Sequence, residues 1–417
     1  MITQQISQMT KDKLLLITFL VWLVTGCTNP APVGINIVPQ PEQQIPAKGY
    51  FTFNESTTIR IENQEQEPVA RLLADLFTTS AGFNPIINAN SSQTATITFS
   101  TNTALAEENY KLEITPSHIS IEAADNRGFF YAVQSIRQLL PPAIESKTPA
   151  EDIQWNIPAV SLQDGPRFPY RGLLLDVSRC FIPKENVIKI IDYMSMLKLN
   201  KLHLHLVDDN GWRLEIKKYP RLTEVGAWRV EREKDFSQRK NAKAGEPTPV
   251  GGFYTQEDMK EIIAYAGTRQ VEIIPEIEMP AHTNSALAAF PELACPVVKD
   301  PIRVIPGMGG HGAKIVYCAG NDKVFSFLQD VLDEVMALFP SRYINLGGDE
   351  ASKRYWKICP LCQARMKAEG FTDIEELQGY FMGRMAGYVK SKGREVIGWD
   401  ELTNSKIPDD AIILGWQ

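Results

Sequence analysis

Two adjacent acids, Asp349 and Glu350, have the types and the position needed for acid chemistry. They follow an apolar run, 343–346, that predicts a strand, and a pair of glycines, 347–348, separates that run from the acids. Side chains that are consecutive on a strand point to opposite faces, so two acids share a site only where the backbone bends, which glycine permits. One acid can then donate a proton while its neighbour positions a group of the substrate. Taken alone, such a pair is most often a solvated strand end.

The acids must be positioned by the elements around them, and the sequence from 166 onward alternates strands with helices. Strands are predicted over 173–177, 201–207, 271–277, 343–346, 395–398 and 411–415, and helices over 184–197, 256–268, 323–339 and 375–389. Repeated strand and helix indicate parallel βα units. A doubly wound sheet is the alternative, but no glycine-rich phosphate loop follows the first strand. The sequence therefore predicts an α/β fold, a (β/α)8 TIM-type barrel. Because about six strands are present, we expect the barrel to be incomplete at its C-terminal end.

Each predicted strand ends in residues that suit a binding site. They are Arg179 after the first strand, Asp208 and Asp209 after the second, His282 after the third, Asp349 and Glu350 after the fourth, Trp399 after the fifth and Trp416 after the sixth. The C-terminal ends of barrel strands meet at one rim, which carries the active site. Acids, a base, Arg or Trp at every predicted strand end are more readily explained by an active site than by a chance distribution of surface residues.

The chemistry that these residues suit is glycoside hydrolysis. A carboxylic acid can protonate a glycosidic oxygen, and a Trp side chain offers a flat apolar face to a sugar ring. The rival interpretation takes His203 and His205 as a zinc pair in a metal-dependent amidohydrolase. That site would need more histidines on later strands, and only His282 and His311 follow. We expect no metal at this rim.

Residues 35–165 predict a separate small α+β domain. Short strands are predicted over 57–61, 94–100, 110–114 and 119–123, and helical spacing of apolar residues over 69–77 and 128–140. Nothing in this domain pairs carboxylates, histidines or a nucleophile. The catalytic barrel is expected over 166–417.

The first 26 residues predict a secretory signal peptide. Lys11 and Lys13 precede an apolar run, 14–24, which is too short to span a bilayer and ends at Thr25-Gly26-Cys27. The run 23–27 also resembles a bacterial lipobox, in which Cys27 becomes the acylated N-terminus and 27–34 a tether. A signal peptide with an incidental cysteine is the alternative. We expect an exported protein in the cell envelope, held to the membrane by lipid.

Charge and cysteines limit the partners and the cross-links. The formal net charge of −7 disfavours nucleic acid. Export permits disulfides, so Cys295 with Cys318 is a plausible loop staple, and Cys359 with Cys362 is either a tight disulfide or half a metal site. No second CxxC follows, so a zinc ribbon is not expected. Five cysteines remain once Cys27 is set aside, so at least one is expected outside a disulfide, and Cys180 is the candidate.

The motifs resemble those of glycoside hydrolase family 20, the β-N-acetylhexosaminidases. They lie, in the family's order, at 171–179, 203–213, 275–282 and 346–350, and the resemblance runs from about residue 39 to 417. It implies an exo-acting retaining hydrolase that removes terminal β-linked N-acetylglucosamine or N-acetylgalactosamine from chitooligosaccharides and glycans. No cofactor is implied. A sugar-binding lipoprotein without activity is the alternative from another class.

The resemblance also implies a role for each residue. Glu350 would be the general acid/base, and Asp349 would orient the substrate's 2-acetamido group, which closes an oxazolinium ion. Asp208 and His282 would form a hydrogen-bonded relay to Glu350. Arg179, Asp209, Trp399 and Trp416 would bind the substrate. Two departures stand out, Cys180 where the family often has His and Glu278 where Asp is more usual.

Overall fold

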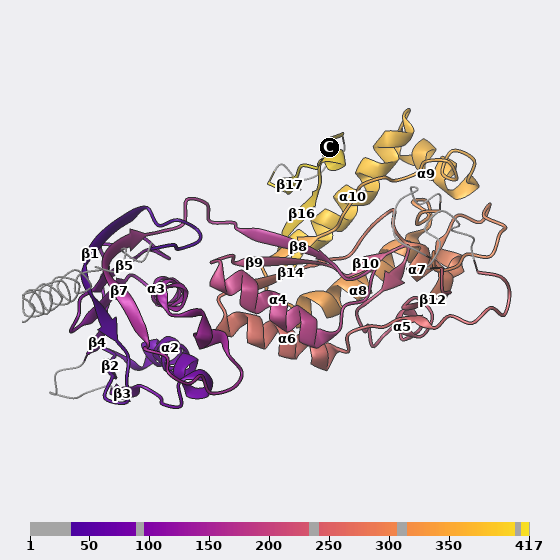
Figure 1. Ribbon diagram of the computed structural model, residues 1–417. Helices are drawn as coiled ribbons and strands as arrows, with labels where there is room; N and C mark the ends of the chain where they lie inside the picture. The colour runs from indigo at the N-terminus through magenta and orange to yellow at the C-terminus, as the bar shows by residue number, and fades with distance from the viewer. Residues whose placement is uncertain (1–34, 89–95, 233–241, 307–314, 405–409, 417) are drawn as a thin grey trace, which may run out of the picture.

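The computed structural model describes residues 35–88, 96–232, 242–306, 315–404 and 410–416. The predicted signal segment, the tether and Cys27 lie outside these residues. Figure 1 shows two domains side by side, an N-terminal β-rich domain and a larger domain in which a curled parallel sheet is flanked by helices. The expected order of a small α+β domain followed by a barrel-type α/β domain is confirmed.

The N-terminal domain is a seven-stranded sheet covered by two helices. Its strand order is β1-β7-β5-β6-β4-β2-β3. In β5 buried and exposed residues alternate, so one face of the sheet packs on the helices. The bounds are β1 Gln43–Thr52, β2 Thr58–Arg60, β3 Ile86–Asn88, β4 Ile97–Thr101, β5 Tyr110–Ile114, β6 Ile119–Ala123 and β7 Asn156–Asp164, with helices α2 Glu67–Ser80 and α3 Asn126–Leu139.

The second domain is built on a parallel sheet of six strands in the order β17-β16-β15-β14-β9-β8. All six agree with predicted strands: β8 Gly172–Asp176, β9 Lys201–His205, β14 Glu272–Glu276, β15 Tyr343–Asn345, β16 Glu395–Trp399 and β17 Ile412–Leu414. The connecting helices agree with the four predicted ones: α4 Lys184–Met196, α6 Gln256–Thr268, α8 Asp322–Leu338 and α10 Ile374–Ser391. In the described sheet, β8 and β17 are the two edge strands.

Shorter elements extend the loops after the strands. They are β10 Val207–Asp208 paired with β11 Gly211–Trp212, β12 Trp228–Arg229 paired with β13 Val250–Gly251, and the helices α5 Arg221–Glu224, α7 Asn284–Ala289 and α9 Pro360–Glu369. These segments were not predicted: two-residue strands and the short helices α5 and α7 carry almost no periodicity, and α9 buries only Cys362.

Local sequence signals set where the helices begin. α6 starts at a capping box in which the Thr255 hydroxyl accepts the N–H of Asp258 and the Asp258 carboxylate accepts the N–H of Thr255. α10 starts at a second capping box, formed by Asp373 and Glu376. The helices pack their apolar sides on the sheet, and Leu202 and Leu204 of β9 are fully buried beneath them.

Charged residues join the two domains. The Arg171 guanidinium donates to the Glu108 carboxylate at 2.8 Å and to the Tyr131 hydroxyl at 2.9 Å. Lys198 Nζ lies 2.7 Å from the Asp164 carboxylate. These mostly buried ion pairs fix the N-terminal domain against the start of the sheet, at the end opposite the rim.

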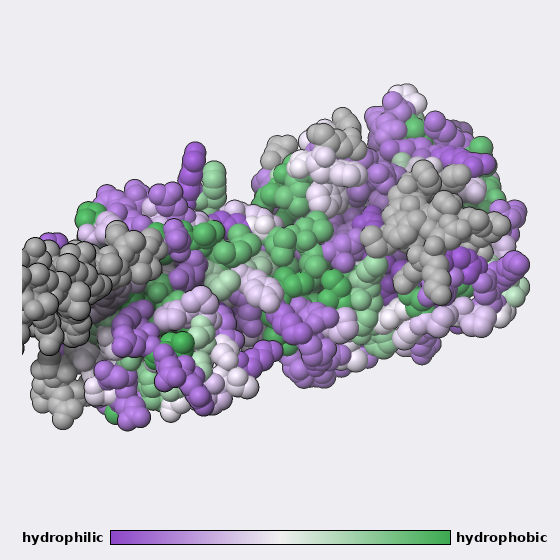
Figure 2. Space-filling view, in the orientation of Figure 1, coloured by the Kyte–Doolittle hydropathy of each residue, from purple (hydrophilic) through white to green (hydrophobic). Residues whose placement is uncertain are grey.

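The surface is not uniformly polar. Figure 2 shows hydrophobic side chains gathered over β8 and its neighbours, and Leu173 and Leu174 of β8 are 39% and 42% exposed. Consecutive strand residues point to opposite faces, so exposure of both marks β8 as an uncovered edge. Among the described residues, no helix has the length and apolar content needed to cross a membrane.

Candidate active site

The glycine bend predicted after β15 is present, and it separates the two acids. Gly347 and Gly348 have φ of 66° and 104°, values that side chains disfavour. An added Cβ at Gly347 would also lie 1.7 Å from a carboxylate oxygen of Glu278. After this bend Asp349 is buried, whereas Glu350, with φ of 48°, is turned outward and its side chain is 35% exposed.

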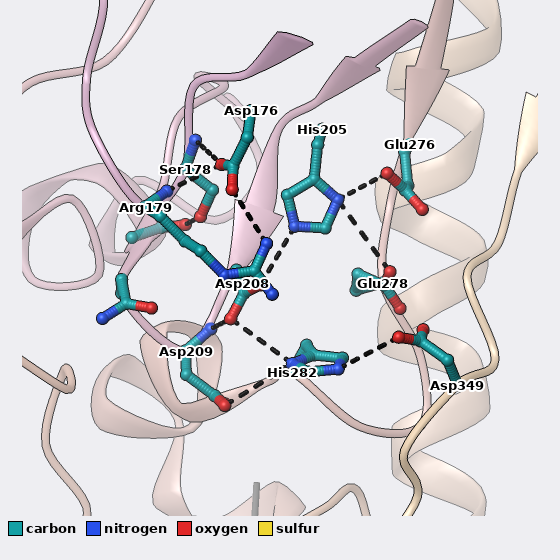
Figure 3. A network of polar contacts seen from close by, with 12 residues as sticks. Asp176, Ser178, Arg179, His205, Asp208, Asp209, Glu276, Glu278, His282 and Asp349 are labelled. Atoms are coloured by element: carbon teal, nitrogen blue, oxygen red, sulfur yellow. Dashed lines mark hydrogen bonds and ion pairs between the residues drawn. The ribbon is translucent and has the colours of Figure 1, made fainter. Parts of the chain in front are cut away.

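His282 lies between two groups of acids at the rim (Figure 3). Its Nδ1 lies 3.4 Å from Asp208 and 3.6 Å from Asp209, and its Nε2 lies 3.3 Å from Asp349 and 3.6 Å from Glu350. Burial lowers the pKa of His282, but its contacts with Asp208, Asp209 and Asp349 outweigh burial and hold that pKa well above the ordinary value. The imidazole is therefore held as a cation between carboxylates.

The relay expected from Asp208 through His282 leads mainly to Asp349 in the structure. The backbone bend puts the Asp349 carboxylate inside the rim and closer to Nε2, while Glu350 is turned toward the opening. The backbone N–H of Glu350 donates to a carboxylate oxygen of Glu401 at 2.9 Å, which fixes this outward turn.

Asp208 connects His282 to the residues that follow β8. Its Oδ2 accepts from Arg179 at 2.6 Å and from His205 Nε2 at 3.0 Å. Arg179 also donates to Asp176 at 2.8 Å. Burial raises the pKa of Asp208, but the hydrogen bonds from His205 and His282 outweigh it, so the pKa lies well below the ordinary value.

Asp209 is placed differently from the expectation that it binds substrate. It is buried, its Oδ1 accepts the backbone N–H of Asn284 at 3.0 Å, and its Oδ2 faces His282. The cause is the tight β10–β11 turn, which directs Asp209 back toward the start of α7. In this geometry Asp209 positions His282.

A buried network beneath the rim was missed by the sequence analysis. The Glu276 carboxylate accepts from His203 Nε2 at 3.0 Å and from His205 Nδ1, and Trp399 Nε1 donates to its other oxygen at 2.9 Å. Asn345 Nδ2 lies 3.0 Å from His203 Nε2. Burial raises the pKa of Glu276, but the two histidines outweigh it and the pKa lies well below the ordinary value. The signal was the alternation of His203 with His205 and of Glu276 with Glu278, which places each pair on one face of a strand.

Glu278 is a second buried acid in this region. It is 1% exposed, and its Oε2 has no hydrogen-bond partner among the described residues. Burial, with the negative charges of Asp349 and Glu276, raises the pKa of Glu278 well above the ordinary value. Burial and like charge therefore favour the protonated form of Glu278, whereas the histidines favour the anion of Glu276.

The buried carboxylate of Asp349 has one oxygen without a partner. Its Oδ2 faces His282, whereas its Oδ1 is buried and accepts no hydrogen bond from any described residue. A buried acceptor without a donor costs about 1–3 kcal/mol, so a donor from a bound molecule is the natural partner.

The two tryptophans lie at the edge of the site. The rings of Trp399 and Trp416 have centroids 6.3 Å apart and planes at 60°. Trp399 is anchored to Glu276 by its N–H, and Trp416 is 52% exposed. Together they offer apolar ring surface at this edge, and the sugar-binding role expected for them stays a prediction.

The two histidines of the rival zinc pair contact acids. Both ring nitrogens of His205 contact carboxylates, and the Nε2 of His203 contacts Glu276 and Asn345. Both histidines therefore pair with Glu276 of the neighbouring strand β14, and the expectation of no metal at this rim stays a prediction.

The two possible disulfides are not formed in the structure, and half a metal site stays open as the other interpretation of Cys359 and Cys362. Neither Cys295–Cys318 nor Cys359–Cys362 forms a disulfide in the structure, and all four are buried thiols. Their sulfur atoms lie within 4.8 Å of one another in one cluster, because the loops after β14 and β15 meet. Cys180 is half-buried and does not belong to this cluster.

Comparisons with known proteins agree with the fold. The model of glycosyl hydrolase family 20, catalytic domain, matches residues 168–417, and that of domain 2 of the same family matches 34–165. The chain is 41% identical over 92% of its length to a β-hexosaminidase of Porphyromonas gingivalis and 34% identical over 92% to one of Vibrio furnissii. It spans 48% and 60% of the lengths of these two relatives.

Solved structures with a similar fold are likewise β-N-acetylhexosaminidases or related enzymes. The chain matches a β-N-acetylhexosaminidase of Bacteroides fragilis with a TM-score of 0.76 and 34% identity, covering 92% of this chain and 71% of that one. It matches an exo-β-N-acetylglucosaminidase of Vibrio harveyi, solved with N-acetylglucosamine, with a TM-score of 0.78 and 32% identity, covering 91% and 57%. This chain belongs to glycosyl hydrolase family 20.

Proposed function

We propose that this chain carries the active site of an exo-acting β-N-acetylhexosaminidase that uses the substrate's own acetamido group as the nucleophile. The observation that carries the proposal is the unpartnered Oδ1 of buried Asp349 beside the half-exposed Glu350. An acetamido N–H is a donor of the right kind for that oxygen. Ordinary glucosides lack such a group at C2.

Glu350 acts as the acid. Its side chain reaches the opening, where a glycosidic oxygen can approach, and it donates a proton to that oxygen as the C1–O bond breaks. The acetamide oxygen attacks C1 from the other side of the ring and closes an oxazolinium ion. Glu350, now a carboxylate, takes a proton from the water that attacks C1, and the ring opens with net retention.

Asp349 stabilises the positive charge that develops on the acetamido group. Its Oδ1 accepts the acetamido N–H, which fixes the carbonyl oxygen toward C1 and balances the charge of the oxazolinium ion. The substrate supplies the nucleophile, so no second protein carboxylate is required opposite Glu350. The adjacency of the two acids therefore fits this chemistry, in which one gives a proton and the other orients a group.

The residues behind the acids hold them in position. His282 pairs with Asp349, and Asp208 pairs with His282 and with Arg179. Arg179 binds sugar hydroxyls through the guanidinium N–H groups that Asp176 and Asp208 do not engage. Trp399 and Trp416 supply the apolar face for the ring and for the acetamido methyl.

The test uses chromogenic substrates and the stereochemistry of the product. We expect the whole protein to release nitrophenol from the β-N-acetylglucosaminide and from the β-N-acetylgalactosaminide, with little release from the β-glucoside. Proton NMR of the first product should show the β-anomer. Substrates with one, two and three fluorines on the acetyl group should react progressively more slowly, because fluorine weakens the acetamide nucleophile.

Two results would contradict the proposal. Binding of N-acetylglucosamine without hydrolysis would favour a sugar-binding protein on an inactive barrel. Rates that do not respond to acetyl fluorination would exclude the acetamide as nucleophile while leaving glycosidase activity intact.

A further inference from the structure

The four buried cysteines come from two loops that are distant in sequence. Cys295 and Cys318 lie between β14 and α8, and Cys359 and Cys362 lie at the start of α9, after β15. All four are 0–2% exposed. Three of the contacts between their sulfur atoms, Cys295–Cys362, Cys318–Cys359 and Cys318–Cys362, measure 3.7 Å.

These distances fit a shared metal ion. Four thiolates arranged tetrahedrally at about 2.3 Å from zinc have sulfur atoms about 3.8 Å apart. A disulfide requires about 2.05 Å, and each of the closest contacts is far longer. A cubane iron–sulfur cluster would hold its cysteine sulfurs farther apart than the 4.8 Å that contains all four here. The cluster therefore has the dimensions of a mononuclear site.

The backbone around the cluster is built for close approach. A Cβ added at Gly320 would lie 2.2 Å from the carbonyl carbon of Leu361 and 2.5 Å from the nitrogen of Cys362, so only glycine lets the two loops meet. This close approach brings the chain just after Cys318 against the backbone at Cys362.

The helix α9 adds favourable electrostatics. Cys359 is its N-cap and Pro360 occupies the first turn, and no side chain accepts a hydrogen bond from the helix end. Cys362 is the third residue of the helix. Cys359 and Cys362 therefore lie at the positive end of the helix dipole, where a negatively charged group is favoured.

We propose that Cys295, Cys318, Cys359 and Cys362 bind one structural zinc ion that joins the loops after β14 and β15. On binding, the thiols release their protons to solvent and all four tetrahedral positions are taken by sulfur. With no position left for water or substrate, the ion has a structural role. The site stands apart from the acids of the rim and does not depend on the proposed function.

The site connects to the rim through short backbone links. The N–H of Tyr317 donates to the carbonyl of Pro280 at 3.0 Å, two residues before His282, and the indole N–H of Trp356 donates to the carbonyl of Tyr317 at 2.9 Å. Trp356 belongs to the loop between β15 and α9, which also carries Asp349 and Glu350. The zinc ion therefore braces the two loops that hold His282 and the acids.

Metal content of the whole protein, purified without chelator, tests the proposal. We expect about one zinc ion per chain by inductively coupled plasma mass spectrometry, and none in the Cys359→Ser/Cys362→Ser variant. Cys180→Ser is the matched control, since it removes a thiol outside the cluster and should keep the zinc. Removal of zinc should lower Tm by about 10 °C or more.

A second measurement does not depend on whether the variant folds. Wild-type protein is reduced, freed of metal and titrated with Zn²⁺ while 4-(2-pyridylazo)resorcinol competes for the ion; uptake of one equivalent supports the site. Co²⁺ in its place should give the visible absorption of tetrahedral cobalt thiolate. Absence of uptake by the folded, reduced protein would overturn the proposal, as would two disulfides that reform in preference to zinc binding. Iron in place of zinc would overturn the identity of the ion.

Discussion

Nε2 of His282 lies 3.3 Å from Oδ2 of Asp349, and this contact leaves Oδ1 as the only oxygen of that carboxylate without a partner among the described residues. Oδ2 of Asp349 is thus held by His282, and Oδ1 is left to accept a hydrogen bond from the proposed substrate. The cation and the carboxylate hold each other in position before the substrate arrives, so little reorganisation is needed during the reaction.

Asp349→Asn should damage reactions of acetamido sugars selectively. The amide keeps the shape but cannot accept a hydrogen bond through nitrogen and does not balance the oxazolinium charge. We expect kcat for nitrophenyl N-acetylglucosaminide to fall by about 100- to 1,000-fold, with a smaller change in KM. The weak hydrolysis of the glucoside serves as the control. Equal losses on both substrates would indicate a general structural role for Asp349.

The loss of rate caused by Glu350→Gln should depend on whether the leaving group needs a proton. The variant cannot protonate the departing oxygen, so kcat/KM should fall by about 100- to 10,000-fold for a poor leaving group such as methanol. For dinitrophenol, which leaves without a proton, cleavage of the glycosidic bond should be nearly unchanged. Pre-steady-state kinetics of both glycosides measures this difference. A uniform loss would contradict the assignment of Glu350 as the acid.

The raised pKa of His282 makes part of the stability depend on pH. Because its folded pKa lies well above the ordinary value of 6.5, the contribution is fully present below that value and is lost as pH rises through the folded pKa. His282→Gln should therefore be most destabilising, relative to wild type, at about pH 6, and less so at alkaline pH. Urea unfolding at several pH values measures the difference. If the difference in free energy of unfolding between wild type and variant grew as the pH rises, a cationic His282 would be contradicted.

Glu276 and Glu278 form a matched pair of tests. Glu276 is held as an anion beside His205, whose own pKa is raised by that carboxylate, so Glu276→Gln removes the partner of a buried charge and should cost about 3–5 kcal/mol in the free energy of unfolding. The raised pKa of Glu278 favours its neutral form, which a glutamine resembles, so Glu278→Gln should cost less than about 1.5 kcal/mol. Denaturant titration at neutral pH gives both values. A larger loss of stability for Glu278→Gln than for Glu276→Gln would show that Glu278 is the anion and Glu276 the neutral acid.

Cys27 should determine whether the protein is anchored. Cys27→Ser removes the thiol that a lipoprotein signal acylates, so the variant should move from the detergent phase to the aqueous phase in a Triton X-114 partition. Labelling with an alkyne fatty acid provides the direct readout. Cys180→Ser should partition like wild type. Detergent-phase partition of the Cys27 variant would exclude a lipid anchor at this position.

Much of the architecture could be predicted because its signals are local. Tyr110–Ile114 and Gln256–Thr268 were predicted with the bounds that the structure has, since alternation and helical periodicity with a capping residue lie within each segment. β1 and β7 were missed: the proline and glycine in β1 interrupt its pattern, and its stability comes from pairing with β7 across more than 100 residues.

The sequence by itself determined the type of fold, the residues at the strand ends and the pair Asp349 and Glu350, because each depends on residues adjacent in the chain. Only the tertiary structure decided that His282 pairs with Asp349, that Asp209 faces inward, and that four cysteines from two loops form one cluster. These contacts join residues far apart in sequence. Their geometry is fixed by how parallel strands align and how the loops pack over them, and no local pattern encodes that.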